Sequence, residues 1–298
     1  MKRTKKIVSL LVAVALLLSA LSAATQAFAA GSYDIPDGLQ ADLQDIYDKY
    51  NFTVGWGLYD ISGSSLKEVA SYNADRVFQS NCTIKAAMLL YICKLMDQGK
   101  LSKNTLIKVD TDKMNYGGLT SGEYTVDFLL TNMIRVSNSA CFEVLHRYVT
   151  TKAFNSFLAS LGSGTRMTSY SFMGTCKPSD RAKEWFAIYK YCHSDAKNAN
   201  YAWWQFLTAK YSPIRDGLKT KLVAHKGGWY DKGNKGSCGD CAIVKSRNGG
   251  CYLVVIFTQN NQVGDYNTDL LGDLACTLDD VWNSYYKSLD KKTNAKFF

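Results

Sequence analysis

The spacing of apolar and polar residues predicts a chain that changes between helices and strands. Residues 39–50 have the period of an amphipathic helix, and residues 52–60 and 65–73 read as two strands joined by the turn ISGS. A helix is predicted from Thr83 to Gly99, and apart from Lys85 and Lys94 every position from Ile84 to Met96 is apolar, which predicts that this helix is buried inside the protein. Lys85 is an exception within this helix, and a lysine is almost never buried without a partner.

The middle of the chain is helical in pattern, and strands return near its end. Helices are predicted over residues 125–136, 139–149, 151–162, 179–192 and 199–211, the fourth with Ser179 as its N-cap. Strands are predicted over residues 222–228, 241–246 and 251–259, the last two joined by the hairpin signal RNGG. A terminal amphipathic helix is predicted over residues 268–289.

This order of elements predicts an α+β fold, in which one antiparallel sheet of five strands is flanked by helices. The first and last parts of the chain, residues 31–80 and 213–298, are expected to share that sheet. Residues 81–212 are expected to form an all-helical lobe beside it.

The first thirty residues predict a secretory signal peptide. A basic start, MKRTKK, precedes an apolar run from Ile7 to Leu21 and the small residues AFAA, so cleavage is expected after Ala29 or Ala30. The apolar run is shorter than the roughly 20 residues that span a bilayer, so we expect secretion without a stable membrane anchor. Cleavage removes four basic residues, which lowers the net charge from +9 to +5. With no basic run, we expect no nucleic-acid partner.

Nine cysteines are present, and in an exported protein some of them can pair, although an odd number leaves one unpaired within the chain. The sequence CGDC at residues 238–241 resembles half of a zinc site. No second C-x-x-C follows, and the chain has only three histidines, so we expect no metal. No nucleotide or flavin motif is present, and we expect no cofactor.

Chemistry is indicated where the buried helix begins, in the sequence CTIK. Cys82 and Lys85 are three positions apart and therefore share one helix face. A thiolate at a helix N-terminus is favoured by the helix dipole, and Lys85 can add its charge or, when neutral, accept a proton. The alternative is a structural one, in which Lys85 extends past a core cysteine toward water.

Two further stretches complete a pattern with CTIK. Ser137-Asn138-Ser139 lies between two predicted helices, and Lys226-Gly227-Gly228 ends a predicted strand. With CTIK they follow the order and approximate spacing of S-x-x-K, S-D-N and K-T-G. Over residues 35–290 the chain therefore resembles the class A β-lactamase-like, penicillin-recognising serine hydrolases, with cysteine in place of the nucleophilic serine.

The resemblance implies roles for these residues. Cys82 would be acylated, Lys85 would act as general base or proton relay, and Ser137 would pass a proton to the leaving group. Lys226 would supply positive charge near Ser137 and a substrate carboxylate. The substrate-binding positions would be Ser139, Gly227, Gly228 and Trp229, and the amides of Cys82 and Trp229 would form the oxyanion hole.

Departures from the family pattern change the expected activity. Ser139 replaces an asparagine that contacts the substrate amide, and Gly227 replaces a threonine or serine that helps to bind the substrate carboxylate. No Asp or Glu lies between Glu143 and Asp180, where the family's deacylating glutamate belongs. An acyl-enzyme formed from a β-lactam is therefore expected to persist.

The sequence thus predicts an exported acyl-enzyme hydrolase or acyl transferase that is a poor β-lactamase. Its substrate would be an amide, peptide or ester, small or derived from the cell wall. One alternative is a true β-lactamase with a relocated acid such as Glu184, although an exposed helix charge is the plainer role for that residue. Another is a non-catalytic binding module on the same fold. The sequence leaves the oligomeric state open.

Overall fold

The computed structural model of the chain describes residues 33–50, 52–170, 173–219, 223–230, 236–246, 250–259 and 268–294. The predicted signal peptide, residues 1–30, lies outside the described residues.

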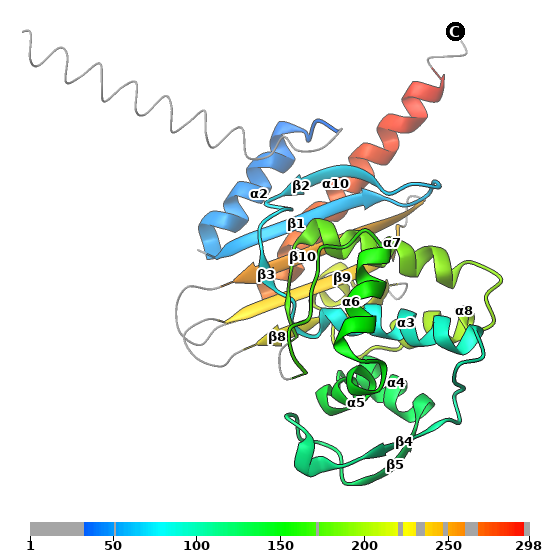
Figure 1. Cartoon of the computed structure of the whole chain (residues 1–298). Coiled ribbons are helices and arrows are strands. Elements are labelled where there is room, and N and C mark those ends of the chain that lie inside the picture. The colour runs from blue at the N-terminus through cyan, green and yellow to red at the C-terminus, as the bar shows by residue number, and fades with distance from the viewer. Residues whose placement is uncertain are drawn as a thin grey trace, which may run out of the picture.

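An antiparallel sheet forms the centre of the fold and confirms the predicted α+β class (Figure 1). Its strands follow the order β2-β1-β10-β9-β7, so the first and last parts of the chain meet where β1 pairs with β10. The bounds of these strands are β1 Thr53–Asp60, β2 Lys67–Tyr72, β7 Val223–His225, β9 Ser237–Lys245 and β10 Cys251–Gln259.

The edge strand differs from the prediction of one strand over residues 222–228. It is divided into β7 and a further strand, β8 (Gly228–Tyr230), and both pair with β9. The break falls at Lys226 and Gly227, although the Lys226 amide still donates to the carbonyl of Cys241 at 3.0 Å. The described part of the sheet therefore has six strands rather than five.

Both faces of the sheet are buried, which explains why its central strands are apolar throughout. Alternate residues of β10 point to opposite faces: Tyr252, Val254 and Ile256 enter one hydrophobic cluster, and Leu253, Val255 and Phe257 enter the other. The first cluster also contains side chains of α2 (Asp37–Tyr50), α9 (Pro213–Leu218) and α10 (Thr268–Asn294). These helices cover one face, and the helical lobe covers the other (Figure 1).

The helical lobe surrounds α3 (Lys85–Asp97), which is buried along most of its length as predicted. The surrounding helices are α4 Val126–Arg135, α5 Ser139–Val149, α6 Thr151–Ser160, α7 Pro178–Cys192 and α8 Ala199–Leu207. The predicted cap of α7 is wrong. The helix begins at Pro178, a position that its fixed φ favours, and the Ser179 hydroxyl instead donates to Asp75 at 2.7 Å.

Several short elements are too brief for any period to show in the sequence. The two-residue strands β3 (Phe78–Gln79) and β6 (Thr175–Cys176) pair with each other, and β4 (Leu106–Val109) pairs with β5 (Gly122–Thr125). Because β4, β5 and β6 lie within residues 81–212, the expectation that this lobe is all-helical is wrong. Two 3-10 turns, η1 (Asn81–Ile84) and η2 (Thr111–Lys113), complete the described elements. The β3–β6 pair joins the chain before α3 to the segment before α7.

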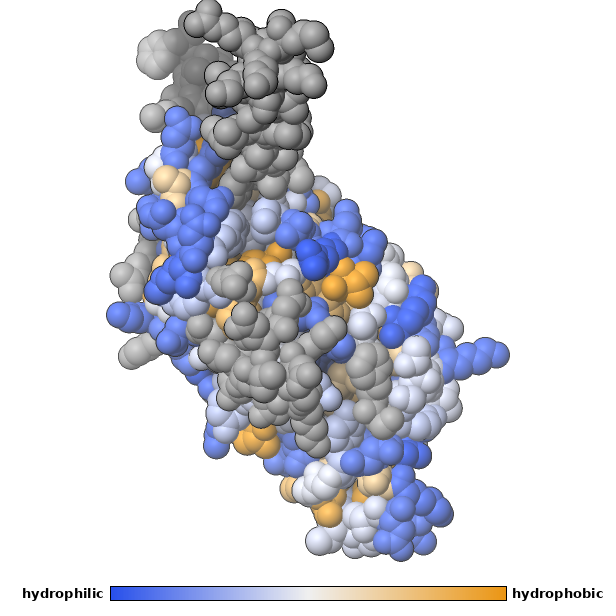
Figure 2. Space-filling view, turned by 90° about the vertical axis from the view of Figure 1, so that its left-hand side faces the viewer, coloured by the Kyte–Doolittle hydropathy of each residue, from blue (hydrophilic) through white to orange (hydrophobic). Residues whose placement is uncertain are grey.

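The surface of the described residues is mixed in character. On the face shown in Figure 2, hydrophobic side chains form small separate patches among hydrophilic ones. Among the helices within the described residues, none has the length and apolar character needed to cross a membrane.

Candidate active site

Cys82 lies in η1, the 3-10 turn that leads directly into α3. The turn is fixed from both sides: the Ser80 amide donates to the carbonyl of Gly174 at 3.0 Å, and the Ser80 hydroxyl accepts from the buried guanidinium of Arg181. Asn81 has a left-handed φ of 47°, and its side-chain amide donates to the Ser237 hydroxyl at 3.2 Å. A strained residue held by such contacts is typical of functional sites.

The Lys85 amine meets three groups from two segments of the chain, the turn before its own helix and residues 137–139. Its nitrogen lies 3.0 Å from the Cys82 sulfur, 2.6 Å from the carbonyl oxygen of Ser137 and 3.1 Å from the Ser139 hydroxyl. Lys85 is fully buried, whereas Cys82 is only half-buried. The side chain thus ends in a polar site, which excludes the structural alternative of a lysine that extends past a core cysteine toward water.

Ser137 lies between the two lysines. The amine of Lys226 donates to the Ser137 hydroxyl at 2.9 Å, and the amine of Lys85 lies 3.4 Å from the same oxygen. Ser137 has a left-handed φ of 59°. The next residue, Asn138, caps α5 by accepting from the Cys141 amide at 3.0 Å. The structure therefore brings Cys82, Lys85, Ser137 and Lys226 into one cluster.

The predicted substrate-binding positions lie beside this cluster. The backbone of β8 is pressed against η1: a Cβ atom on Gly228 would stand 2.4 Å from the Cys82 amide nitrogen. A Cβ on Gly227 would stand 3.0 Å from the carbonyl oxygen of Tyr211 and 3.4 Å from the carboxyl of Asp240. Trp229 is about one-third exposed (36%) and packs edge-to-face on Tyr211.

The charges in the cluster favour a thiolate at neutral pH. Burial opposes ionisation of Cys82, but the positive charges of Lys85 and Lys226 outweigh it, helped by hydrogen bonds from Ser137 and Lys85. Together they lower the pKa of the thiol to about 6. The pKa of Lys226 is lowered to about 8. Burial is the main cause and the charge of Lys85 adds to it, while the negative charge of the Cys82 thiolate acts in the opposite direction.

Asp240 is a buried carboxyl near Lys226 that the sequence analysis did not single out. It belongs to the CGDC stretch, whose spacing suggested half of a zinc site. Cys238 and Cys241 belong to the clusters on opposite faces of the sheet, so they do not converge on one ion.

Asp240 accepts from the Ser212 hydroxyl at 2.6 Å and from the amides of Ile214 and Cys241. Burial raises its pKa to about 7.

Tyr116 is a second residue that no sequence motif marks. Burial raises the pKa of its phenol, and negative charge at Cys82 adds to the rise. Its loop is held by Glu143, a fully buried carboxylate that accepts from the amides of Asn115 and Tyr116 and pairs with Arg147.

Glu184 is not an exposed helix charge, and that expectation is wrong. The residue is fully buried and forms an ion pair with Arg181, which is also fully buried. Its other oxygen accepts from the Ser163 hydroxyl at 2.7 Å. Because Arg181 also donates to Ser80, this pair supports the turn that carries Cys82.

All nine cysteines lie within the described residues, and all are free thiols. Cys82 is half-buried, and its lowered pKa sets it apart from the exposed Cys276, whose pKa burial and nearby acids raise. The thiol chemistry of the chain is therefore expected to concentrate at Cys82.

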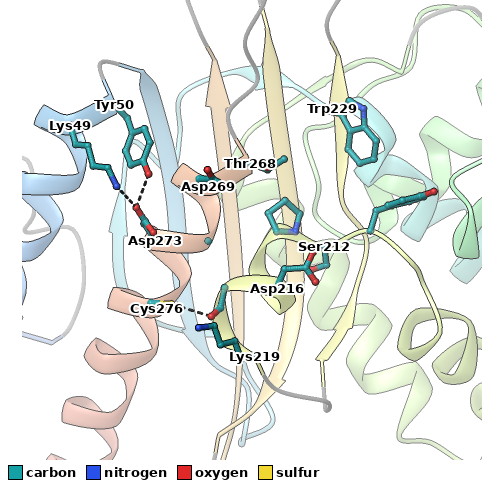
Figure 3. Close-up of a pocket in the computed structure, with 14 residues that line it drawn as sticks. Lys49, Tyr50, Ser212, Asp216, Lys219, Trp229, Thr268, Asp269, Asp273 and Cys276 are labelled. Carbon is teal, nitrogen blue, oxygen red and sulfur yellow. Dashed lines mark hydrogen bonds and ion pairs between the residues drawn. The ribbon is translucent and has the colours of Figure 1, made fainter.

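A pocket of about 680 Å³ lies next to the site (Figure 3). Of the predicted site residues, only Trp229 lines it. The far wall is formed by α2 and α10, where Lys49 and Tyr50 both donate to Asp273, at 2.9 and 2.7 Å. The pocket thus meets the predicted site at Trp229, and its lining includes no residue of the cluster around Cys82.

Comparisons with solved structures find the same fold in β-lactamases. The β-lactamase of Desulfarculus baarsii matches with a TM-score of 0.69 at 16% identity, over 82% of this chain and 96% of that one. Those of Sphaerobacter thermophilus and Chitinophaga pinensis match with TM-scores of 0.68 at 17% and 14% identity. Each covers 83% of this chain, and they are matched over 97% and 98% of their own lengths.

No curated protein matches the chain. Residues 38–282, in contrast, match the family described as "Beta-lactamase enzyme family", a span that includes every element from β1 to β10. The resemblance expected from the three motifs is confirmed at the level of the family. The chain belongs to the β-lactamase enzyme family.

Proposed function

We propose that the protein is an exported acyl-enzyme hydrolase or acyl transferase with Cys82 as its nucleophile. The observation that carries this proposal is the position of the Cys82 sulfur, 3.0 Å from the Lys85 amine, in a cluster that lowers the thiol pKa to about 6. A thiolate is then present at neutral pH without further activation. Export is supported by the signal-peptide pattern of residues 1–30.

In the acylation step, the thiolate attacks the carbonyl carbon of an amide, peptide or ester. The amides of Cys82 and Trp229 stabilise the oxyanion, a contribution typically worth several kcal/mol. The leaving group receives its proton from the Ser137 hydroxyl, which is resupplied by the amine of Lys226 at 2.9 Å. Lys85, in contact with both the sulfur and Ser137, stabilises the thiolate and exchanges protons with Ser137.

Turnover of β-lactams is expected to be slow. The segment between Glu143 and Asp180 contains no acid, and Glu184 is occupied by Arg181 and Ser163. A carboxylate held in a buried ion pair cannot also activate a water at the sulfur. The alternative of a true β-lactamase that uses Glu184 therefore has little support.

The alternative of a non-catalytic binding module is also less well supported. That interpretation expects an ordinary thiol at Cys82, whereas the charges of Lys85 and Lys226 help to lower the pKa of Cys82 to about 6. The substrate we propose is a small molecule or a peptide such as one derived from the cell wall. Fold alone does not name it.

The test is to treat the mature protein with benzylpenicillin and separately with iodoacetamide, and to map the adducts by peptide mass spectrometry. We expect the penicilloyl group on Cys82, and alkylation of Cys82 before the exposed Cys276. The Cys82→Ser and Cys276→Ser variants serve as a matched pair. No adduct at Cys82, or equal alkylation of both cysteines, contradicts the proposal.

A further inference from the structure

We propose that the acyl group on Cys82 is transferred to an amine rather than to water, so that the co-substrate is a primary amine. This inference rests on the proposed function, since it concerns the second half of the same reaction. Three features carry it: the charge balance of the cluster, the engagement of the buried carboxylates around it, and the chemistry of a thioester.

Acylation changes the charge balance around Lys226. In the free enzyme the negative thiolate of Cys82 offsets the positive charges of Lys85 and Lys226. The negative charge of the thiolate also raises the pKa of Lys226. In the acyl-enzyme the sulfur is neutral, and two buried amines face each other across the Ser137 hydroxyl. Burial and the charge of Lys85 already lower the pKa of Lys226 to about 8. Without the thiolate it falls further, which leaves a neutral amine as base.

The carboxylates near the site are not available to direct a water molecule. Glu184 is paired with Arg181, and Glu143 holds the loop of Tyr116 and pairs with Arg147. Asp240 accepts from Ser212 and from two backbone amides. Each of these three groups is therefore held by protein donors, unlike a carboxylate that is poised to orient and deprotonate water.

A thioester is attacked more readily by amines than by water, because an amine is the stronger nucleophile and a thiolate is a good leaving group. An incoming amine also benefits from the site itself. The same burial and positive charge that lower the pKa of Lys226 act on a second amine placed beside it, and keep that amine unprotonated and nucleophilic.

The transfer replaces the C–S bond of the thioester with a C–N bond. The nitrogen of the amine attacks the thioester carbonyl, a C–N bond forms, and the C–S bond breaks. The electron pair of that bond returns to Cys82 as a thiolate. The proton lost by the nitrogen passes through the Ser137 hydroxyl to the neutral amine of Lys226, 2.9 Å away. The products are an amide and the free enzyme with its original charge balance.

The experiment begins from the acylated protein. The mature chain is loaded with benzylpenicillin, and in a parallel sample with p-nitrophenyl acetate. After excess donor is removed, the adduct at Cys82 is followed by mass spectrometry in buffer, with glycinamide, or with acetamide at equal concentration. We expect glycinamide to speed loss of the adduct in proportion to its concentration, by about tenfold or more, and acetamide to have no effect. The released product is expected to be the glycinamide amide of the acyl group.

A small thioester with the same acyl group, incubated with glycinamide alone, gives the uncatalysed rate. The Lys226→Met variant is loaded with p-nitrophenyl acetate, because the leaving group of this donor needs no proton from Lys226. We expect this variant to lose most of the acceleration that glycinamide causes. Ser137→Ala provides a second variant, and Lys245→Met, at an exposed lysine of β9, is the matched control.

The outcomes separate this inference from the proposed function. Transfer to amines is overturned if acylated Cys82 loses its adduct at the same rate with and without glycinamide. It is also overturned if the adduct leaves as the free acid when glycinamide is present. In both cases the assignment of Cys82 as the nucleophile stands. Acceleration no greater than that of the small thioester also overturns it. If neither donor acylates Cys82, both proposals fall together.

Discussion

Gly228 and Cys82 approach so closely that no other residue fits at the glycine. The position of a Cβ on Gly228 lies 2.4 Å from the Cys82 amide nitrogen and 2.7 Å from the Cys82 Cβ. Both contacts are shorter than packed atoms allow, and the first is to backbone, which cannot rotate away. Because β8 is also paired with β9, the nucleophile is positioned by the sheet as well as by its own helix.

This contact predicts that Gly228→Ala displaces Cys82 from its catalytic geometry. A displacement of about 1 Å can cost about 100-fold in rate, so acylation of Cys82 by p-nitrophenyl acetate is expected to fall by roughly that factor. Gly63→Ala is the matched control, because nothing lies within 4 Å of its Cβ position. An unchanged acylation rate in Gly228→Ala would show that β8 moves without disturbing the nucleophile.

The lowered pKa of Cys82 predicts the pH profile of its alkylation. Iodoacetamide reacts with the thiolate, so the rate at Cys82 is expected to rise with pH and reach half its maximum near pH 6. Lys85→Met removes a positive charge 3.0 Å from the sulfur and is expected to move the midpoint to higher pH. The measurement is the alkylation rate at Cys82 between pH 4.5 and 9, by peptide mass spectrometry.

Cys276 provides the internal reference in the same samples. It is exposed, and burial together with nearby aspartates raises its pKa, so its alkylation is expected to rise only above the ordinary thiol range. Superimposed profiles for Cys82 and Cys276 would contradict a thiolate held by Lys85 and Lys226.

The elements that the sequence predicted well are those with a repeated period. Helix α5 spans Ser139–Val149 and strand β10 spans Cys251–Gln259, both with the predicted bounds. Each repeats its pattern over several turns or pleats, so local sequence carries enough signal. The β3–β6 pair, with two residues in each strand, has no period to detect and depends on contacts between distant segments.

The contacts of the candidate site also fall into those that local sequence predicts and those that depend on tertiary structure. Cys82 and Lys85 are three positions apart, so helix geometry alone brings them together. The motifs at Ser137 and Lys226 were recognised by resemblance, since no local rule places Ser137 against Lys85, 52 positions before it, or against Lys226, 89 positions after it. Asp240 and Arg181 gave no usable signal, because their importance arises from burial and tertiary partners.

The buried pair of Arg181 and Glu184 predicts a loss of stability without a loss of deacylation. Glu184→Gln leaves Arg181 charged and only partly satisfied in the interior, at an expected cost of about 3 kcal/mol in the free energy of unfolding. Because Glu184 is engaged by Arg181 and Ser163, the rate at which a penicilloyl group leaves Cys82 is expected to stay the same per folded molecule. Urea unfolding and mass spectrometry measure the two quantities.

Lys113→Met is the control for this variant. Lys113 is exposed and pairs with Asp110, whose side chain is also accessible to solvent, and such a pair typically contributes little to stability. If Glu184→Gln instead slows loss of the adduct while stability is unchanged, Glu184 is the relocated acid and the protein is a true β-lactamase.

Asp240 predicts a specific dependence of stability on pH. Burial raises its pKa to about 7 in the folded protein, above the value near 4 expected when the chain is unfolded. Between those two values the folded state holds a proton that the unfolded state has lost, so stability from this group is lost as pH rises from about 4 to 7. Asp240→Asn removes this dependence.

The unfolding free energy of Asp240→Asn minus that of the wild type is therefore expected to increase between pH 4 and 7 and to level off above it. The increase is limited to about 4 kcal/mol, since each unit of pKa is worth about 1.4 kcal/mol. Asparagine cannot accept all the hydrogen bonds of the carboxylate, which adds an offset that does not vary with pH. Only the slope is diagnostic, and it separates the effect of Asp240 from those of Cys82 and Lys226, which both proteins share. A difference that stays flat over this range would mean that the fold does not raise the pKa of Asp240, and a fall confined to pH values below about 4 would mean that Lys226 holds it ionised.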